Sequence, residues 1–94
     1  MDENPDSLPL VERFHKAEHL ARELSEHLRQ ALLPRLAELR TAGKVFDAAE
    51  VSDQELFDRM QSVLQADDFA RQLYARLQSY LKSIERDADR VLNI

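Results

Sequence analysis

Residues 10–31, LVERFHKAEHLARELSEHLRQA, decide the fold, because their apolar residues recur at the spacing of a helix. The apolar positions alternate four and three residues apart, which is the pattern of a heptad seam. They are Leu10, Phe14, Ala17, Ala21, Leu24, Leu28 and Ala31. The spacing predicts a long helix whose seam serves either as the core face of an intramolecular bundle or, from Leu10 to Leu28, as a surface for self-association.

Turn residues on both sides of this stretch extend the predicted helix over residues 8–42. Ser7 can cap its start, Pro9 fits its first turn, and Gly43 suits a left-handed C-terminal position. Pro34 cannot donate to the carbonyl of Gln30 and clashes with it, so a kink or break is expected there. A straight helix of this length would measure about 52 Å, whereas a compact domain of this size is roughly 32 Å across. The chain therefore either folds back at Pro34 or pairs through a protruding helix.

Two further helix starts follow in the sequence. The motif SDQE at residues 52–55 is a capping box, in which Ser52 and Glu55 satisfy backbone donors of a helix that runs to about residue 65. Asp67 or Asp68 can cap a third helix that runs nearly to the C-terminus. No segment alternates with a period of two, so no strand is expected. The predicted fold is all-α: a small bundle of three to four helices in a single domain, residues 1–94, with a flexible acidic N-terminus (1–6) and an inter-helix loop (43–51).

Composition narrows the classes of function. The chain has 94 residues and no cysteine, which excludes disulfides, thiolate nucleophiles and sulfur-ligated zinc. A chain of this length buries only about 65% of its unfolded surface, so a partner or a homodimer is expected. No window approaches the ~18 apolar residues of a membrane span, and a cytoplasmic protein without a membrane partner is predicted.

The three histidines lie in a ladder with four-residue spacing, formed by His15, His19, Glu23 and His27. Helical geometry places this ladder opposite the seam and winds it around the helix. A metal site needs three or four converging ligands, and His15 and His19 supply half a site at best. A hydrated surface is therefore favoured and no metal is expected; a metal-binding helical dimer through His15 and His19 is kept as an alternative.

Charge is unevenly distributed along the chain. Residues 43–68 have a net charge of −5 and residues 69–94 of +2. The basic residues of the C-terminal helix share one face, which could meet the protein's own acidic segment, an acidic partner or phosphates. They are Arg71, Arg76, Lys82, Arg86 and Arg90. An accessory nucleic-acid-binding subunit is one alternative, although the overall net charge of −5 is unfavourable for that function.

Catalysis has little support in the sequence. A single glycine cannot build a phosphate-binding loop, and no base is identifiable for any of the serines. The protein is therefore expected not to be an enzyme and to carry no cofactor.

Apolar residues near the predicted loop are the remaining candidates for a contact. Phe46, Val51 and Phe57 could anchor a protein partner, or Phe46 and Val51 could close the end of the bundle. The sequence thus favours a non-enzymatic protein–protein interaction module: a regulator, an adaptor, a chaperone-like protein or an inhibitory small subunit.

Overall fold

The computed structural model describes residues 4–47 and 51–92, and every regular element in them is helical. The elements are a 3-10 turn η1 (Pro5–Ser7), α1 (Leu10–His27), a π-helical turn η2 (Leu28–Leu32), α2 (Leu33–Asp47) and α3 (Asp53–Leu92). Since α1, η2 and α2 follow one another without a gap, they form a single long helix. The all-helical prediction is confirmed, but three to four helices is wrong: there are two long ones.

The predicted break near residue 67 is absent because Asp67 is an interior helix residue. Its Oδ2 accepts a hydrogen bond of 2.8 Å from Nε of Arg71, one turn further along α3. This i,i+4 pair stabilises a continuing helix and replaces the expected cap. No glycine or proline occurs between residues 53 and 92, so nothing in the sequence stops the helix.

The connection between the two long helices is shorter than the predicted loop. Gly43 lies inside α2 with no left-handed backbone angle, and α2 continues to Asp47. The predicted cap at Ser52 is confirmed: the backbone N–H of Glu55 donates to Ser52 Oγ at 3.1 Å. Residues 43–47 of the predicted loop are therefore helical.

Pro34 disturbs the N-terminal helix without ending it. In η2 the backbone widens, and the N–H of Leu33 bonds to the carbonyl of Leu28, five residues back. A π turn of this kind accommodates the missing donor and the bulk of a proline within a continuous helix. Of the kink or break expected near Pro34, the break does not occur, and the helix is disturbed by the π turn instead.

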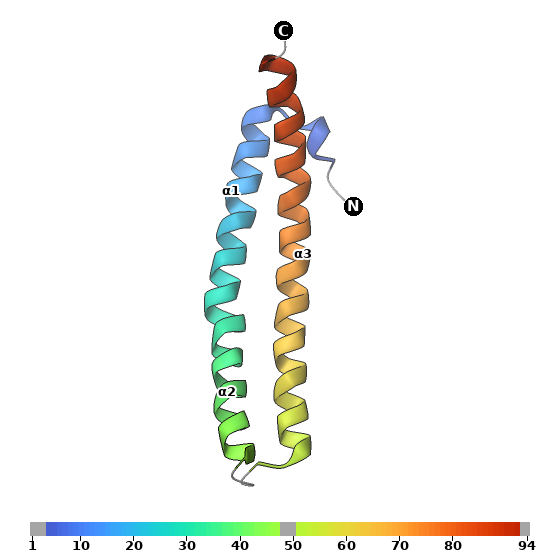
Figure 1. Cartoon of the computed structure of the whole chain (residues 1–94). Helices are drawn as coiled ribbons and strands as arrows, with labels where there is room; N and C mark the ends of the chain where they lie inside the picture. The colour runs from blue at the N-terminus through green and yellow to red at the C-terminus, as the bar shows by residue number, and fades with distance from the viewer. Residues whose placement is uncertain (1–3, 48–50, 93–94) are drawn as a thin grey trace. The chain divides into compact units, whose positions relative to one another are not determined.

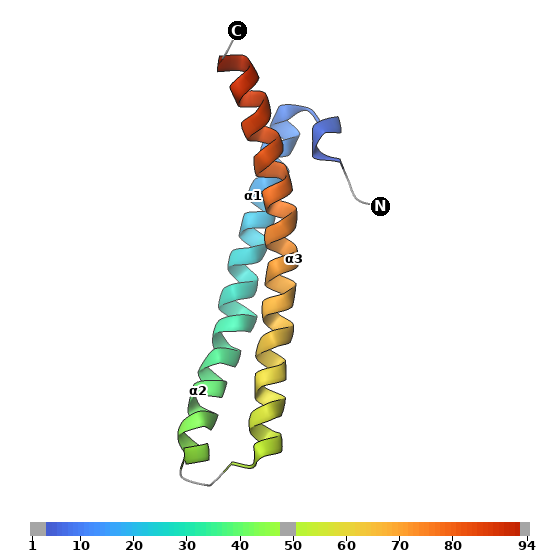
Figure 2. The same ribbon diagram turned by 45° about the vertical axis from the view of Figure 1, so that its right-hand side comes forward.

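The chain divides into two compact units. Unit 1 combines Met1–Leu24 with Gln72–Ile94, and unit 2 is Ser25–Arg71. In unit 1, α1 lies beside the C-terminal half of α3 (Figure 1). In unit 2, α2 lies beside the N-terminal half of α3 (Figure 2). Each unit is thus a pair of helices.

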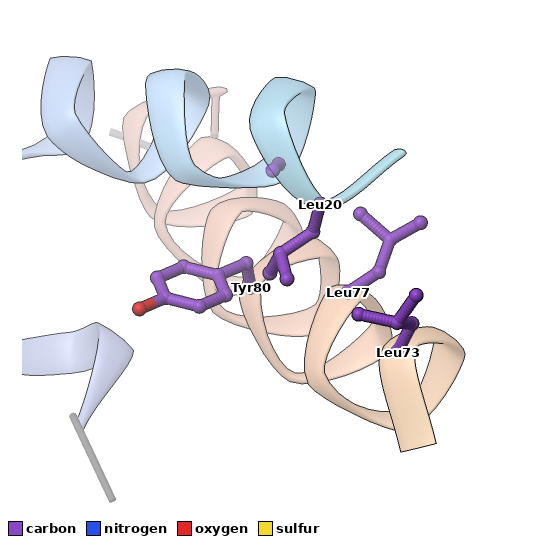
Figure 3. Close-up of a cluster of buried hydrophobic side chains, with 5 residues drawn as sticks. Leu20, Leu73, Leu77 and Tyr80 are labelled. Carbon is purple, nitrogen blue, oxygen red and sulfur yellow. The ribbon is translucent and has the colours of Figure 1, made fainter. Parts of the chain in front are cut away.

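Unit 1 has a core of larger side chains. Ala17 and Leu20 of α1 pack against Leu73, Leu77 and Tyr80 of α3 (Figure 3). Leu8, Leu24 and Ile84 pack around this cluster. As a core face, the predicted seam is correct at Ala17 and Leu24 but not at Phe14 and Ala21, which are exposed, as is Leu28 in unit 2. Arg13 and Leu20 take the buried positions instead. Self-association through the seam stays a prediction.

Unit 2 is built differently. Among its described residues the fully buried hydrophobic side chains are all alanines, namely Ala42, Ala66 and Ala70. Three polar contacts join its helices: His27 to the carbonyl of Ala66 (2.8 Å), Arg35 to the carbonyl of Ser62 (2.9 Å), and Glu38 to Arg59 (3.7 Å). From one contact to the next, the residue number rises on the first helix and falls on the second, so the two helices are antiparallel.

Candidate functional site

The N-terminal turn of unit 1 is held by a group of charged side chains, here called the N-terminal clasp: Asp6, Arg13, Ser83, Arg86 and Asp87. Arg13 is 7% exposed, forms an ion pair with Asp87, and donates from Nε to the carbonyl of Leu8 at 2.9 Å. The carboxylate of Asp6 accepts from Ser83 Oγ at 2.5 Å and from Arg86 Nη1 at 2.8 Å. These contacts fix η1 against α3.

Asp6 is electrostatically favoured as a carboxylate. The hydrogen bond from Ser83 lowers the pKa of Asp6 below its ordinary value of 3.8, and the charges of Arg86 and Arg13 lower it further. Asp6 is therefore a carboxylate at neutral pH, the form that accepts from Ser83 and Arg86.

Unit 1 leaves a row of apolar side chains uncovered beside its core. Val11, Phe14 and Ala21 of α1 and Tyr74 and Leu81 of α3 are exposed. Phe14, Ala21, Tyr74 and Leu81 each follow by one position a buried residue of the contact between the two helices, namely Arg13, Leu20, Leu73 and Tyr80. One position rotates a side chain about 80–100° from that contact. When two helices are antiparallel, side chains that are rotated by the same angle and in the same sense away from the helix–helix contact point to the same face of the pair. These five residues form the apolar side of unit 1.

Unit 2 has an apolar side of the same kind and with larger residues. It is formed by Leu33, Leu36, Phe57, Met60 and Leu64, which are between 43% and 61% exposed. Their helical positions lie about 80–145° from the line of contact between α2 and α3, in the same rotational sense on both helices. Unit 2 thus buries alanines and exposes these three leucines, its methionine and Phe57, whereas Leu32, Leu39, Leu56 and Val63 are half-buried.

The predicted partner anchors do not form one site. Phe57 is exposed and belongs to the apolar side of unit 2. Val51 is half-buried and lines a shallow hollow of about 320 Å³ with Ala37, Ala42 and Arg59. Phe46 lies in α2, and its side chain is outside the described residues.

The predicted basic face is partly neutralised by carboxylates of the chain itself. Arg71 pairs with Asp67 at 2.8 Å, Arg86 with Asp6 at 2.8 Å, and Arg90 approaches Asp87 at 3.6 Å. Arg76 and Lys82 are exposed. Arg71 belongs to unit 2 and the other four to unit 1.

The histidines are distributed differently from the predicted ladder. His15 and His19 are exposed, and His19 Nε2 lies 2.8 Å from Oε1 of Glu23. His27 is half-buried in unit 2, where its Nε2–H donates to the carbonyl of Ala66 and its ring lies 4.6 Å from that of Phe69. The prediction that His27 lies opposite the seam is wrong. Across residues 4–47 and 51–92, no three His, Asp or Glu side chains are grouped to hold a metal ion.

The sequence prediction missed most residues of the two apolar sides. Val11, Leu33, Leu36, Met60, Leu64, Tyr74 and Leu81 were not among its candidate site residues. A signal for these residues was available in the sequence. Around the axis of α3 the apolar residues occupy an arc of about 140°, which is wider than one neighbouring helix can cover.

Comparisons add no function to this geometry. The chain matches no protein-family model, no curated protein and no solved structure. Among the described helices, none is long and apolar enough to cross a membrane.

Proposed function

We propose that this protein is a non-enzymatic protein–protein interaction module, and that it binds another protein through the apolar side of unit 1. The observation that carries the proposal is the exposure of Phe14 (47%), Tyr74 (52%) and Leu81 (43%) on one face of a helix pair that already has a packed core. Exposed apolar residues that gather on one face are typical of interaction sites.

The chemistry of this face suits a helical partner. Aromatic side chains are enriched where interfaces contribute most to binding, and Phe14 and Tyr74 supply them from two different helices. An amphipathic helix laid along the face would cover Phe14, Tyr74 and Leu81 with its own apolar stripe. A role as a regulator, an adaptor, a chaperone-like protein or an inhibitory small subunit in the cytoplasm, as expected from the sequence, fits this mode of binding.

The nucleic-acid alternative has weaker support. Arg71, Arg86 and Arg90 lie close to carboxylates of the same chain, and these would compete with phosphates. The metal alternative would require ligands from a second chain in addition to His15 and His19.

The test uses one surface variant and one matched control. Leu81→Glu places a charge on the apolar side of unit 1, and Ser79→Glu places the same charge on an exposed position of another face of α3. The tagged full chain and both variants are used to capture proteins from cells of the source organism, and the captured proteins are compared by quantitative mass spectrometry. Circular dichroism verifies that the helical content of all three is equal.

We expect a defined partner to be retained by the wild type and by Ser79→Glu, and to be lost with Leu81→Glu. If no captured protein depends on Leu81 while all three chains are folded, the proposed function is wrong.

A further inference from the structure

We infer that the apolar side of unit 2 is an interface between two copies of this chain, which pack face to face as four antiparallel helices. The inference concerns a different unit from the proposed function, so the two can fail independently.

The first argument is that the described core of unit 2 is thin. Its fully buried hydrophobic side chains are alanines, whereas Leu33 (61%), Leu64 (55%) and Phe57 (54%) are exposed. Burial of alanine contributes far less than burial of leucine or phenylalanine. Leu32, Leu39, Leu56 and Val63 are only half-buried, so much of the large apolar surface of unit 2 lies on its outer face. A surface that a unit needs for its own stability requires a partner that is always present. A second copy of the chain meets this requirement.

The second argument is the accessible area. The chain exposes 7161 Å², whereas a compact monomer of 10.9 kDa exposes roughly 5,600 Å² by the scaling of folded proteins. The difference of about 1,500 Å² exceeds the ~800 Å² that each partner buries in a standard interface. The chain therefore has enough uncovered surface for a stable dimer.

The third argument is charge, and it selects one arrangement of the two copies. Between residues 53 and 71, α3 has a net charge of −3, whereas α2 has a net charge of +1. An isologous dimer places α2 either over α2 or over α3 of the second copy. The first choice would bring the two acidic segments of α3 together, which is unfavourable. We therefore place α2 of each copy over α3 of the other.

The register within unit 2 defines which residues meet in this arrangement. Arg35 contacts Ser62 and Glu38 contacts Arg59, so Leu36 is level with residue 61 and Lys44 is level with Asp53. Across the interface, Leu36 of one copy then lies against Met60 of the other. Lys44 of one copy approaches Asp53 of the other at the rim.

Disulfide cross-linking tests this arrangement directly, since the chain has no cysteine of its own. A cross-link forms only where two Cα atoms approach within about 7 Å. Leu36→Cys and Met60→Cys chains are mixed under a mild oxidant, and each is also oxidised alone. We expect a covalent dimer in the mixture and little in either single sample. A dimer from Leu36→Cys alone would place α2 over α2 and overturn the arrangement, and no cross-link in any sample would overturn the interface.

Thermal unfolding provides a second readout with a matched control. Leu64→Glu charges the apolar side of unit 2, whereas Gln65→Glu places the same charge on another exposed face of α3. For a dimer the melting temperature rises with protein concentration. We expect this rise for the wild type and Gln65→Glu, and a lower melting temperature without the rise for Leu64→Glu. A melting temperature independent of concentration in the wild type, or a rise retained in Leu64→Glu, would contradict the inference.

Discussion

Arg13 is buried in unit 1, one position before Phe14, the residue that hydrophobic periodicity assigns to the seam. It is buried because Asp87 neutralises it and because two backbone carbonyls, of Leu8 and Asp6, accept from its guanidinium. Periodicity counts only apolar residues and therefore selects Phe14, one position further along. The partner of Arg13 is 74 residues distant in the sequence, so this exchange could not be predicted from local pattern.

Replacing Arg13 by Ala should cost about 3 kcal/mol of unfolding free energy, because Asp87 is then left as a half-buried charge without its partner. Denaturation by urea at fixed protein concentration measures this loss. The control is Arg22→Ala, which removes an exposed ion pair with Glu18 and should cost about 0.5 kcal/mol or less. Equal losses of unfolding free energy for the two variants would show that the buried ion pair stabilises the fold no more than the exposed one.

Asp6 predicts a pH dependence with a definite sign. Its pKa is lowered in the folded chain, so its contribution to stability is present above the ordinary value of 3.8 and is lost as the pH falls through the lower folded pKa. The stability advantage of the wild type over Asp6→Asn should therefore be constant near neutral pH and vanish under strongly acidic conditions. Chemical denaturation of both chains at several pH values measures it. An advantage that persists in strong acid, or is absent at neutral pH, would contradict the role of the clasp.

At the scale of the elements, caps and interior pairs are difficult to distinguish in sequence. Ser52 and Asp67 are both short polar residues ahead of apolar stretches, and both were predicted as caps. Ser52 caps α3, whereas Asp67 lies within it and pairs with Arg71. The segments that precede these two residues differ. Ser52 follows a connection between two helices, whereas Asp67 follows a segment that is already helical. A capping motif therefore predicts a helix start reliably only where the preceding helix has ended.

Alanine substitutions distinguish these two roles. Ser52→Ala should lower the unfolding free energy by about 1 kcal/mol, the typical cost of a lost cap. Asp67→Ala should lower it by about 0.5 kcal/mol or less, as for an exposed i,i+4 pair. Both values come from urea denaturation at one protein concentration. A loss of about 1 kcal/mol at Asp67 would indicate that α3 is interrupted there.

The π turn η2 shows what the sequence can predict about a proline. A disturbance near Pro34 was expected and occurs, because a missing donor and a steric clash are local properties. Its form was not predictable, since a kink, a break and a π turn all relieve the same clash. The packing of α2 against α3 in unit 2, through Arg35 and Leu39 among others, favours a helix that continues.

At the scale of the whole molecule, the sequence predicts that the chain is all-helical and that a partner or a homodimer covers part of its surface. It does not predict which apolar residues face outward. In each helix two adjacent apolar stripes compete for one seam, and only the pairing of the helices decides between them. In unit 1 Leu20 and Leu73 face inward, while Phe14 and Tyr74 face outward. The candidate surfaces therefore emerge only from the fold.

The most direct test of this account is the solution mass of the wild-type chain, measured by light scattering over a range of protein concentrations. The account predicts twice the mass of the chain, with dissociation only at the lowest concentrations, because the leucines, Met60 and Phe57 of unit 2 need a second copy to cover them. The mass of a single chain at every concentration, with the helices intact, would contradict it.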